Sequence, residues 1–103
     1  MSNSLKIVFS PEAEIDLDNI FAYISENLSA PQAAADLITR VERTCQRLID
    51  HPFSCPVPKN EYLAEKGYRM LVIENFIAFY VVGENAINVM RIIYGKRDYQ
   101  KLL

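Results

Sequence analysis

Apolar residues in the first half of the chain recur at helical spacing and predict two amphipathic helices. Ser10 supplies an N-cap oxygen and Pro11 suits the first helical position, so we expect the first helix to begin there. Its apolar face consists of residues three or four positions apart, namely Ala13, Leu17, Ile20, Ile24 and Leu28. After a break at residues 29–31, a second apolar face runs to about Asp50 and consists of Ala34, Leu37, Val41, Cys45 and Leu48. Because the break is short, the two helices are expected to pack as an antiparallel hairpin.

The other apolar runs predict strands. Residues 5–9 form a short first strand, and three further strands are expected over residues 68–74, 76–82 and 86–94. The last three runs are apolar on both faces, as buried central strands are. By strict alternation, one face of the last run carries Ile87, Val89, Arg91 and Ile93, and the opposite face carries Asn88, Met90, Ile92 and Tyr94. Residues 51–66 contain three prolines and no clear period, so they are expected to form a loop.

This order of elements predicts an α+β fold class. We expect an antiparallel sheet of about four strands with an α-helix hairpin on one face, in the order β-α-α-β-β-β. The length suits a single domain over residues 1–103. Because the hairpin covers only one face, the other face needs a protein partner, a second copy of the chain or the C-terminal tail.

Composition and charge narrow the class of protein further. With 50% hydrophobic residues and only three glycines, the chain is neither disordered nor fibrous. It has no apolar run long enough for a membrane helix and no signal-peptide pattern, so we expect a cytoplasmic protein with reduced cysteines. The net charge of −2 argues against general affinity for nucleic acid. Residues 1–39 hold one Lys against six Asp/Glu (−5) and residues 40–103 hold ten Lys/Arg against seven Asp/Glu (+3), so an acidic partner would meet the C-terminal part.

Motifs for metal or nucleophilic chemistry are sparse. His51 is the single histidine, and Cys45 and Cys55 lack the clustered partners of a zinc site, so no metal or other cofactor is expected. A nucleophilic pair of Cys55 and His51 is conceivable, but a histidine before Pro52 is more typical of a helix end. The three glycines lie far apart and form no phosphate-binding loop.

Two groups of cationic residues are candidates for binding. Arg40, Arg43 and Arg47 share one side of the second helix, which is typical of a solvated face with Asp36 paired to Arg40. Near the C-terminus, cations and tyrosines alternate, with Arg69 on a strand of the same sheet; this cluster consists of Arg91, Tyr94, Lys96, Arg97, Tyr99 and Lys101. Such residues can bind phosphate, stack on a base or transfer a proton. A solvent-exposed rim at the edge of a sheet has the same composition, so that interpretation stays open. Arg91 interrupts an apolar run, so it requires a carboxylate partner or a groove.

The whole pattern resembles the RelE/ParE superfamily of bacterial type II toxin–antitoxin systems. The stretches that carry the resemblance are residues 15–20, 23–24, 51–53, 68–69, 75–82 and 91–99. RelE-like members cut mRNA on the ribosome without a metal, whereas ParE-like members inhibit DNA gyrase. The segments at 15–20, 51–53 and 75–80 favour the ParE branch, and Ile77 stands where RelE-like toxins place a phosphate-binding arginine. Two features depart from this preference: Tyr94 replaces a histidine usual in ParE tails, and Lys96 with Arg97 fits RelE tails equally well.

The resemblance implies a ParE-like gyrase inhibitor that a cognate antitoxin neutralises and that meets operator DNA only through that antitoxin. The target-binding residues would be Arg91, Tyr94, Lys96, Arg97, Tyr99 and Lys101, with no catalytic residue. The first alternative is a metal-independent endoribonuclease acting on ribosome and mRNA through Arg69, Arg91, Tyr94, Arg97 and Tyr99. The second alternative is a remnant that binds its antitoxin without activity.

Overall fold

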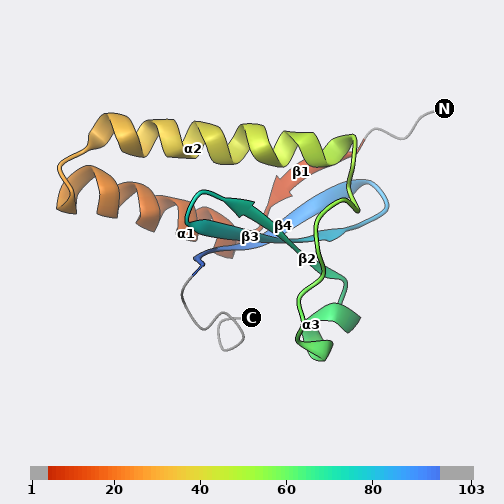
Figure 1. Ribbon diagram of the computed structural model, residues 1–103. Helices are drawn as coiled ribbons and strands as arrows, with labels where there is room; N and C mark the ends of the chain where they lie inside the picture. The colour runs from red at the N-terminus through yellow and green to blue at the C-terminus, as the bar shows by residue number, and fades with distance from the viewer. Residues whose placement is uncertain (1–4, 96–103) are drawn as a thin grey trace.

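The helices and strands of the protein follow the predicted order (Figure 1). The computed structural model describes residues 5–95. Its elements are β1 (Lys6–Phe9), α1 (Pro11–Ala22), the π-helix η1 (Tyr23–Asn27), α2 (Pro31–Gln46), the 3₁₀ turn η2 (Arg47–Ile49), α3 (Glu61–Glu65), β2 (Tyr68–Ile73), β3 (Phe76–Val82) and β4 (Ala86–Tyr94). The hairpin of helices and the three later strands are therefore confirmed, and the fold class is α+β.

The sheet has four strands in the order β1-β4-β3-β2. Antiparallel pairing joins β2 to β3 and β3 to β4, as predicted. β1 instead pairs with β4 in parallel, which corrects the expectation of a wholly antiparallel sheet. A parallel pair needs a long crossover connection, and the chain between β1 and β4 supplies it.

The hydrophobic core lies between the helix hairpin and one face of the sheet (Figure 1). The predicted stripe of α2 and η2 supplies Leu37, Val41, Cys45 and Leu48, and the sheet supplies Ile73, Ala78, Tyr80, Ile87, Val89 and Ile92. Tyr80 is fully buried, and its hydroxyl donates to the Pro52 carbonyl at 2.9 Å. This bond satisfies the one polar atom of that side chain and ties the loop after α2 to the core.

The end of the first helix departs from the predicted stripe. Tyr23–Asn27 forms a π-helical turn, in which the Leu28 amide donates back to the Tyr23 carbonyl at 3.2 Å. A turn of this kind contains one extra residue and so shifts the phase of the side chains that follow. Leu28 was expected on the apolar face, but it is 55% exposed.

β4 contains an irregularity that reverses its predicted alternation. Its register with β3 shifts between Phe79 and Tyr80, so that Phe79 stands opposite Arg91 whereas Tyr80 stands opposite Val89. The residue between them, Met90, is therefore the extra residue of a bulge. As a result Ile92 joins Ile87 and Val89 in the core cluster, whereas strict alternation had placed it on the opposite face.

Two further expectations are corrected in and around residues 51–66. Asn60 caps α3 by accepting from the Leu63 amide at 3.1 Å, and Leu63 is buried, so part of the expected loop is helical. The five-residue helix is too short to show an apolar period. β2, expected to be a central strand, lies at the edge of the sheet, and its Val72 is 62% exposed.

The two cysteines are free thiols with different surroundings. Burial of Cys45 raises the pKa of its thiol to about 12, so at pH 8 only about one molecule in 10⁴ carries the reactive thiolate there. We expect iodoacetamide at pH 8 to label one cysteine of the folded protein, the half-buried Cys55, and both cysteines after unfolding. Mass spectrometry of a Cys55→Ser variant is the control; rapid labelling of that folded variant would contradict the buried position of Cys45.

Candidate protein-binding interface

Tyr94, at the end of β4, borders a mostly apolar hollow on the surface. The residue is 40% exposed, and its ring meets the Phe76 ring edge-to-face, with the centroids 5.8 Å apart. The hollow, of about 620 Å³, is lined by Asn19, Ile20, Tyr23, Ile24, Leu28, Asn75, Phe76 and Tyr94. Tyr23 and Leu28 are each 55% exposed beside it. Exposed aromatic and aliphatic groups around a concavity are typical of a protein-binding surface.

Two further apolar side chains are exposed on α1. Ile15 is 58% exposed and Phe21 is 40% exposed, although both belong to a helix that already buries Ala13 against the core. Sequence reasoning missed this surface, since Ile15 and Phe21 fall outside the predicted stripe and were not singled out. The signal was present: large apolar residues on the outer side of an amphipathic helix indicate a second contact face.

Arg91 is held by a carboxylate, which is one of the two environments expected for it. Its Nε donates to Asp16 Oδ2 at 2.8 Å and its Nη2 donates to Asp16 Oδ1 at 3.0 Å, a bidentate pair. The Ile92 amide also donates to Asp16 Oδ2, at 2.9 Å. These hydrogen bonds raise the pKa of Arg91 above its ordinary value. Asp16 thus fixes both the Arg91 side chain and the backbone just past the bulge.

The neighbouring residue Ser10 extends this junction between α1 and β4. Its amide donates to the Val89 carbonyl at 2.9 Å, and its hydroxyl donates to the Met90 carbonyl at 2.8 Å. The same hydroxyl accepts from the Ala13 amide at 3.0 Å, which confirms Ser10 as the N-cap of α1. β1 pairs with β4 only as far as Val89, so Ser10 and Asp16 supply the hydrogen-bond partners beyond that point.

Arg69 is engaged elsewhere. Its Nη1 donates to the Cys55 carbonyl at 2.7 Å and to the Phe53 carbonyl at 3.1 Å, and its guanidinium lies 5.1 Å from the centre of the Phe53 ring. The arginine therefore fastens the loop after α2 onto β2. Two backbone carbonyls and the Phe53 ring therefore hold the Arg69 side chain in place, and no bound substrate is needed for this.

The candidate cations of the sheet do not converge. Arg69 stands opposite Tyr80 in the register, whereas Arg91 stands opposite Phe79. Because successive residues of a strand point to opposite faces, the guanidinium groups of Arg69 and Arg91 are directed apart. The other predicted site residues, Lys96, Arg97, Tyr99 and Lys101, lie outside the described residues.

The arginines of α2 are exposed, as expected for a solvated face, but their pairing differs from the prediction. Arg40 forms an ion pair with Glu74 at 2.9 Å, and not with Asp36. Asp36 instead accepts from Gln32 Nε2 at 2.9 Å. The tight turn between β2 and β3 brings Glu74 over α2, a contact that helical spacing alone could not reveal.

Over residues 5–95, His, Cys, Asp and Glu side chains nowhere gather in the groups of three or more that a metal ion needs.

Comparisons with known proteins bear on the family and the fold of the chain. Residues 7–99 match the family described as "ParE toxin of type II toxin-antitoxin system, parDE". A solved structure described as "Chromosomal ParDE TA system from P. aeruginosa" is similar with a TM-score of 0.74 and 21% sequence identity, covering 90% of this chain and 98% of that chain. At this identity the likeness concerns the fold. No curated protein matches the chain.

Within the described part of the chain, no helix combines the length and apolarity that crossing a membrane requires.

Proposed function

Because this chain belongs to the ParE toxin family of type II toxin–antitoxin systems, we propose that it arrests bacterial growth by binding DNA gyrase. A toxin of this kind has a cognate antitoxin as its partner. In the proposed mechanism no covalent bond of the target is cut by the toxin. The protein acts in the cytoplasm as a single domain over residues 1–103, and it reaches operator DNA only through the antitoxin.

The proposal rests on the separation of Arg69 and Arg91, the cations of the sheet within the described residues. Cleavage of RNA without a metal needs several donors aimed at one phosphate, because negative charge grows there in the transition state. Arg69 is occupied by carbonyls of the loop after α2, and Arg91 is occupied by Asp16. Ile77 holds the position on β3 where the nuclease branch has a cation. A toxin that acts by binding its target, without cleaving it, does not need these side chains to point at one phosphate.

The hollow beside Tyr94 is the proposed start of the gyrase-binding surface. Tyr94 is fixed by its contact with Phe76 and still exposes 40% of its surface, which suits an aromatic anchor. The predicted contacts of the tail would extend this surface and consist of Lys96, Arg97, Tyr99 and Lys101. Arg91 then acts as a positioning residue, since its bonds to Asp16 hold the end of β4.

The antitoxin is proposed to cover exposed apolar side chains of the first helix. Ile15, Phe21 and Tyr23 are between 40% and 58% exposed there. A partner segment that folds on binding gains affinity by covering such groups.

Expression in cells separates the proposed activity from its rival. The toxin is induced with and without the product of the neighbouring gene, and two outputs are read: a DNA-damage reporter and the map of mRNA ends. We expect DNA damage with intact mRNA, and we expect the antitoxin to suppress the DNA damage. Codon-positioned mRNA cuts without DNA damage would overturn the gyrase proposal, and toxicity that persists with the antitoxin would overturn the proposed partnership.

A further inference from the structure

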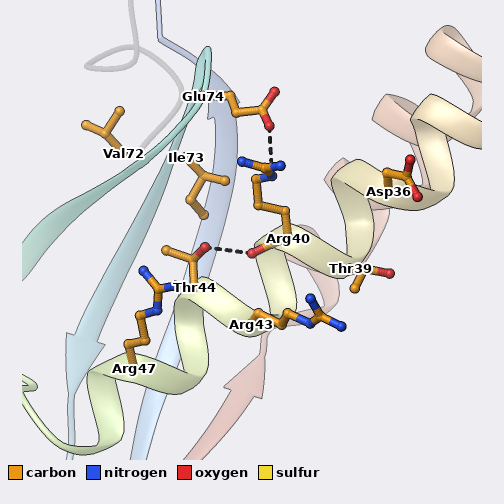
Figure 2. A pocket seen from close by; sticks show the side chains of 9 residues that line it. All are labelled: Asp36, Thr39, Arg40, Arg43, Thr44, Arg47, Val72, Ile73 and Glu74. Atoms are coloured by element: carbon orange, nitrogen blue, oxygen red, sulfur yellow. Dashed lines mark hydrogen bonds and ion pairs between the residues drawn. The ribbon is translucent and has the colours of Figure 1, made fainter.

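A basic hollow of about 600 Å³ lies between α2 and the end of β2 (Figure 2), and two of its residues, Val72 and Glu74, also border a smaller hollow that contains Tyr94. Its walls consist of Asp36, Thr39, Arg40, Arg43, Thr44, Arg47, Val72, Ile73 and Glu74. Arg40 and Arg43 lie on exposed positions of α2, and Arg47, also exposed, begins the turn η2 that follows it. None of these residues contributes to the surfaces assigned above to gyrase or to the antitoxin.

The charge in this hollow is only partly neutralised. Arg40 is paired with Glu74, and the Asp36 carboxylate accepts from Gln32. Among the described residues, Arg43 and Arg47 have no carboxylate within ion-pair distance. Figure 2 shows the guanidinium of Arg47 on the side of the helix that faces β2, whereas that of Arg43 lies farther from the strand. The hollow therefore offers two cations to an incoming acidic group.

The edge of β2 offers backbone groups beside these cations. The Met70 amide donates to the Pro56 carbonyl at 2.9 Å, so Met70 directs its backbone groups away from β3. In an antiparallel pair every second residue does so, and Val72 is therefore the next residue whose amide and carbonyl point outward. Within residues 5–95, no hydrogen-bond partner meets Val72 on that side. An outward amide and carbonyl on an exposed edge strand can pair with an added strand.

We propose that this edge, from Val72 onward and beyond the Met70 amide that Pro56 already occupies, binds an acidic, extended segment of a protein partner as a fifth strand of the sheet. Figure 2 shows the Ile73 side chain directed toward α2 and the Val72 side chain directed away from it. A strand added beside them would alternate in the same way. Every second residue would lie on the α2 side, beside the hollow that Arg43 and Arg47 line, and should be Asp or Glu. The residues between them would lie next to Val72 and should be apolar.

A peptide fits this surface better than RNA does. Val72 presents 62% of its surface on the outer side, which suits an aliphatic side chain and not a phosphate. The outward amide and carbonyl match a peptide backbone, which carries one donor and one acceptor per residue. Asp36 and Glu74 on the same walls would repel a continuous chain of phosphates, whereas isolated carboxylates can avoid them.

Synthetic peptides test this proposal on the full-length protein. The probe is fluorescein-labelled (Glu-Val)₄, measured by fluorescence anisotropy at low salt. Its controls are Glu₄Val₄, which has the same composition without alternation, and (Lys-Val)₄. We expect only the alternating acidic peptide to bind well. Its affinity should fall at least about tenfold in the double variant Arg43→Glu/Arg47→Glu and stay unchanged in Lys59→Glu/Lys66→Glu, which makes the same charge change at exposed sites outside the hollow.

Hydrogen exchange on the unmodified protein provides the second measurement. Saturation with (Glu-Val)₄ should slow exchange of the Val72 amide, because that amide gains a backbone partner. Equal binding of Glu₄Val₄, unchanged affinity of the double variant or an unprotected Val72 amide would each overturn the proposal. Tighter binding of a U₁₂ oligonucleotide than of the peptide would assign the hollow to RNA instead. None of these outcomes depends on whether gyrase is the target.

Discussion

Replacing Asp16 with alanine is expected to lower the free energy of unfolding by about 3 kcal/mol, because three donors lose their acceptor at once. Two belong to the Arg91 guanidinium and one is the Ile92 amide. The pair is mostly shielded from solvent, with side-chain exposures of 25% for Arg91 and 13% for Asp16. Urea unfolding followed by circular dichroism measures the change.

A double-mutant cycle assigns this effect to the ion pair. Arg91→Ala alone should cost less than Asp16→Ala, since Asp16 then keeps the Ile92 amide. The cycle should give a coupling energy of about 1–2 kcal/mol. Asp18→Ala, on an exposed position of the same helix, is the matched control and should stay within about 0.5 kcal/mol of the unmodified protein. An Asp16→Ala variant as stable as the control would show that Arg91 is not held as described.

Tyr94→Ala should weaken binding to gyrase by about 30-fold, the effect of losing one aromatic anchor worth about 2 kcal/mol. Tyr94→Phe should retain binding within about threefold, because the ring that contacts Phe76 is preserved and no proton transfer is required. Surface plasmon resonance with immobilised gyrase measures both affinities. The comparison separates the ring from the hydroxyl.

A tyrosine distant from the hollow supplies the control for these two variants. Tyr62, 59% exposed on α3, contacts Lys66 and not the Tyr94 hollow, so Tyr62→Ala should leave gyrase binding unchanged. The nuclease alternative predicts another pattern: Tyr94→Phe would keep target binding and lose cleavage. Equal loss in Tyr94→Phe and Tyr94→Ala would contradict the role of Tyr94 as an apolar anchor.

Local sequence signals predicted most of the fold because each depends on residues close in the chain. The N-cap of Ser10 requires only the amide three residues later, and the core face of α2 follows from a spacing of three and four. β3 and β4 have the predicted bounds, since long apolar runs bounded by turn residues leave little choice.

Features that depend on pairing between distant segments were not predictable in this way. The bulge at Met90 arises from the register of β4 against β3, and it moves Ile92 to the core face without any mark in the sequence. The parallel pairing of β1 and the edge position of β2 are likewise properties of the assembled sheet.

The candidate site shows the same division between local and distant information. Sequence reasoning identified Arg91 as a charge that needed a partner, yet that partner, Asp16, lies 75 residues away in the chain and could not be identified by spacing. Tyr94 was identified from its neighbours in the chain, whereas the hollow beside it depends on Tyr23 and Leu28. The π-helical turn that leaves Leu28 exposed follows from hydrogen bonding that spacing does not encode.

Inhibition of purified gyrase tests the central claim most directly. Relaxed plasmid, ATP and gyrase are incubated with increasing amounts of the full-length protein, and supercoiling is followed on agarose gels. We predict that supercoiling stops near one toxin per gyrase subunit, that cleaved DNA accumulates, and that added antitoxin reverses both effects. Undiminished supercoiling at a large excess of folded toxin, together with cleavage of mRNA in a translating extract, would contradict the account.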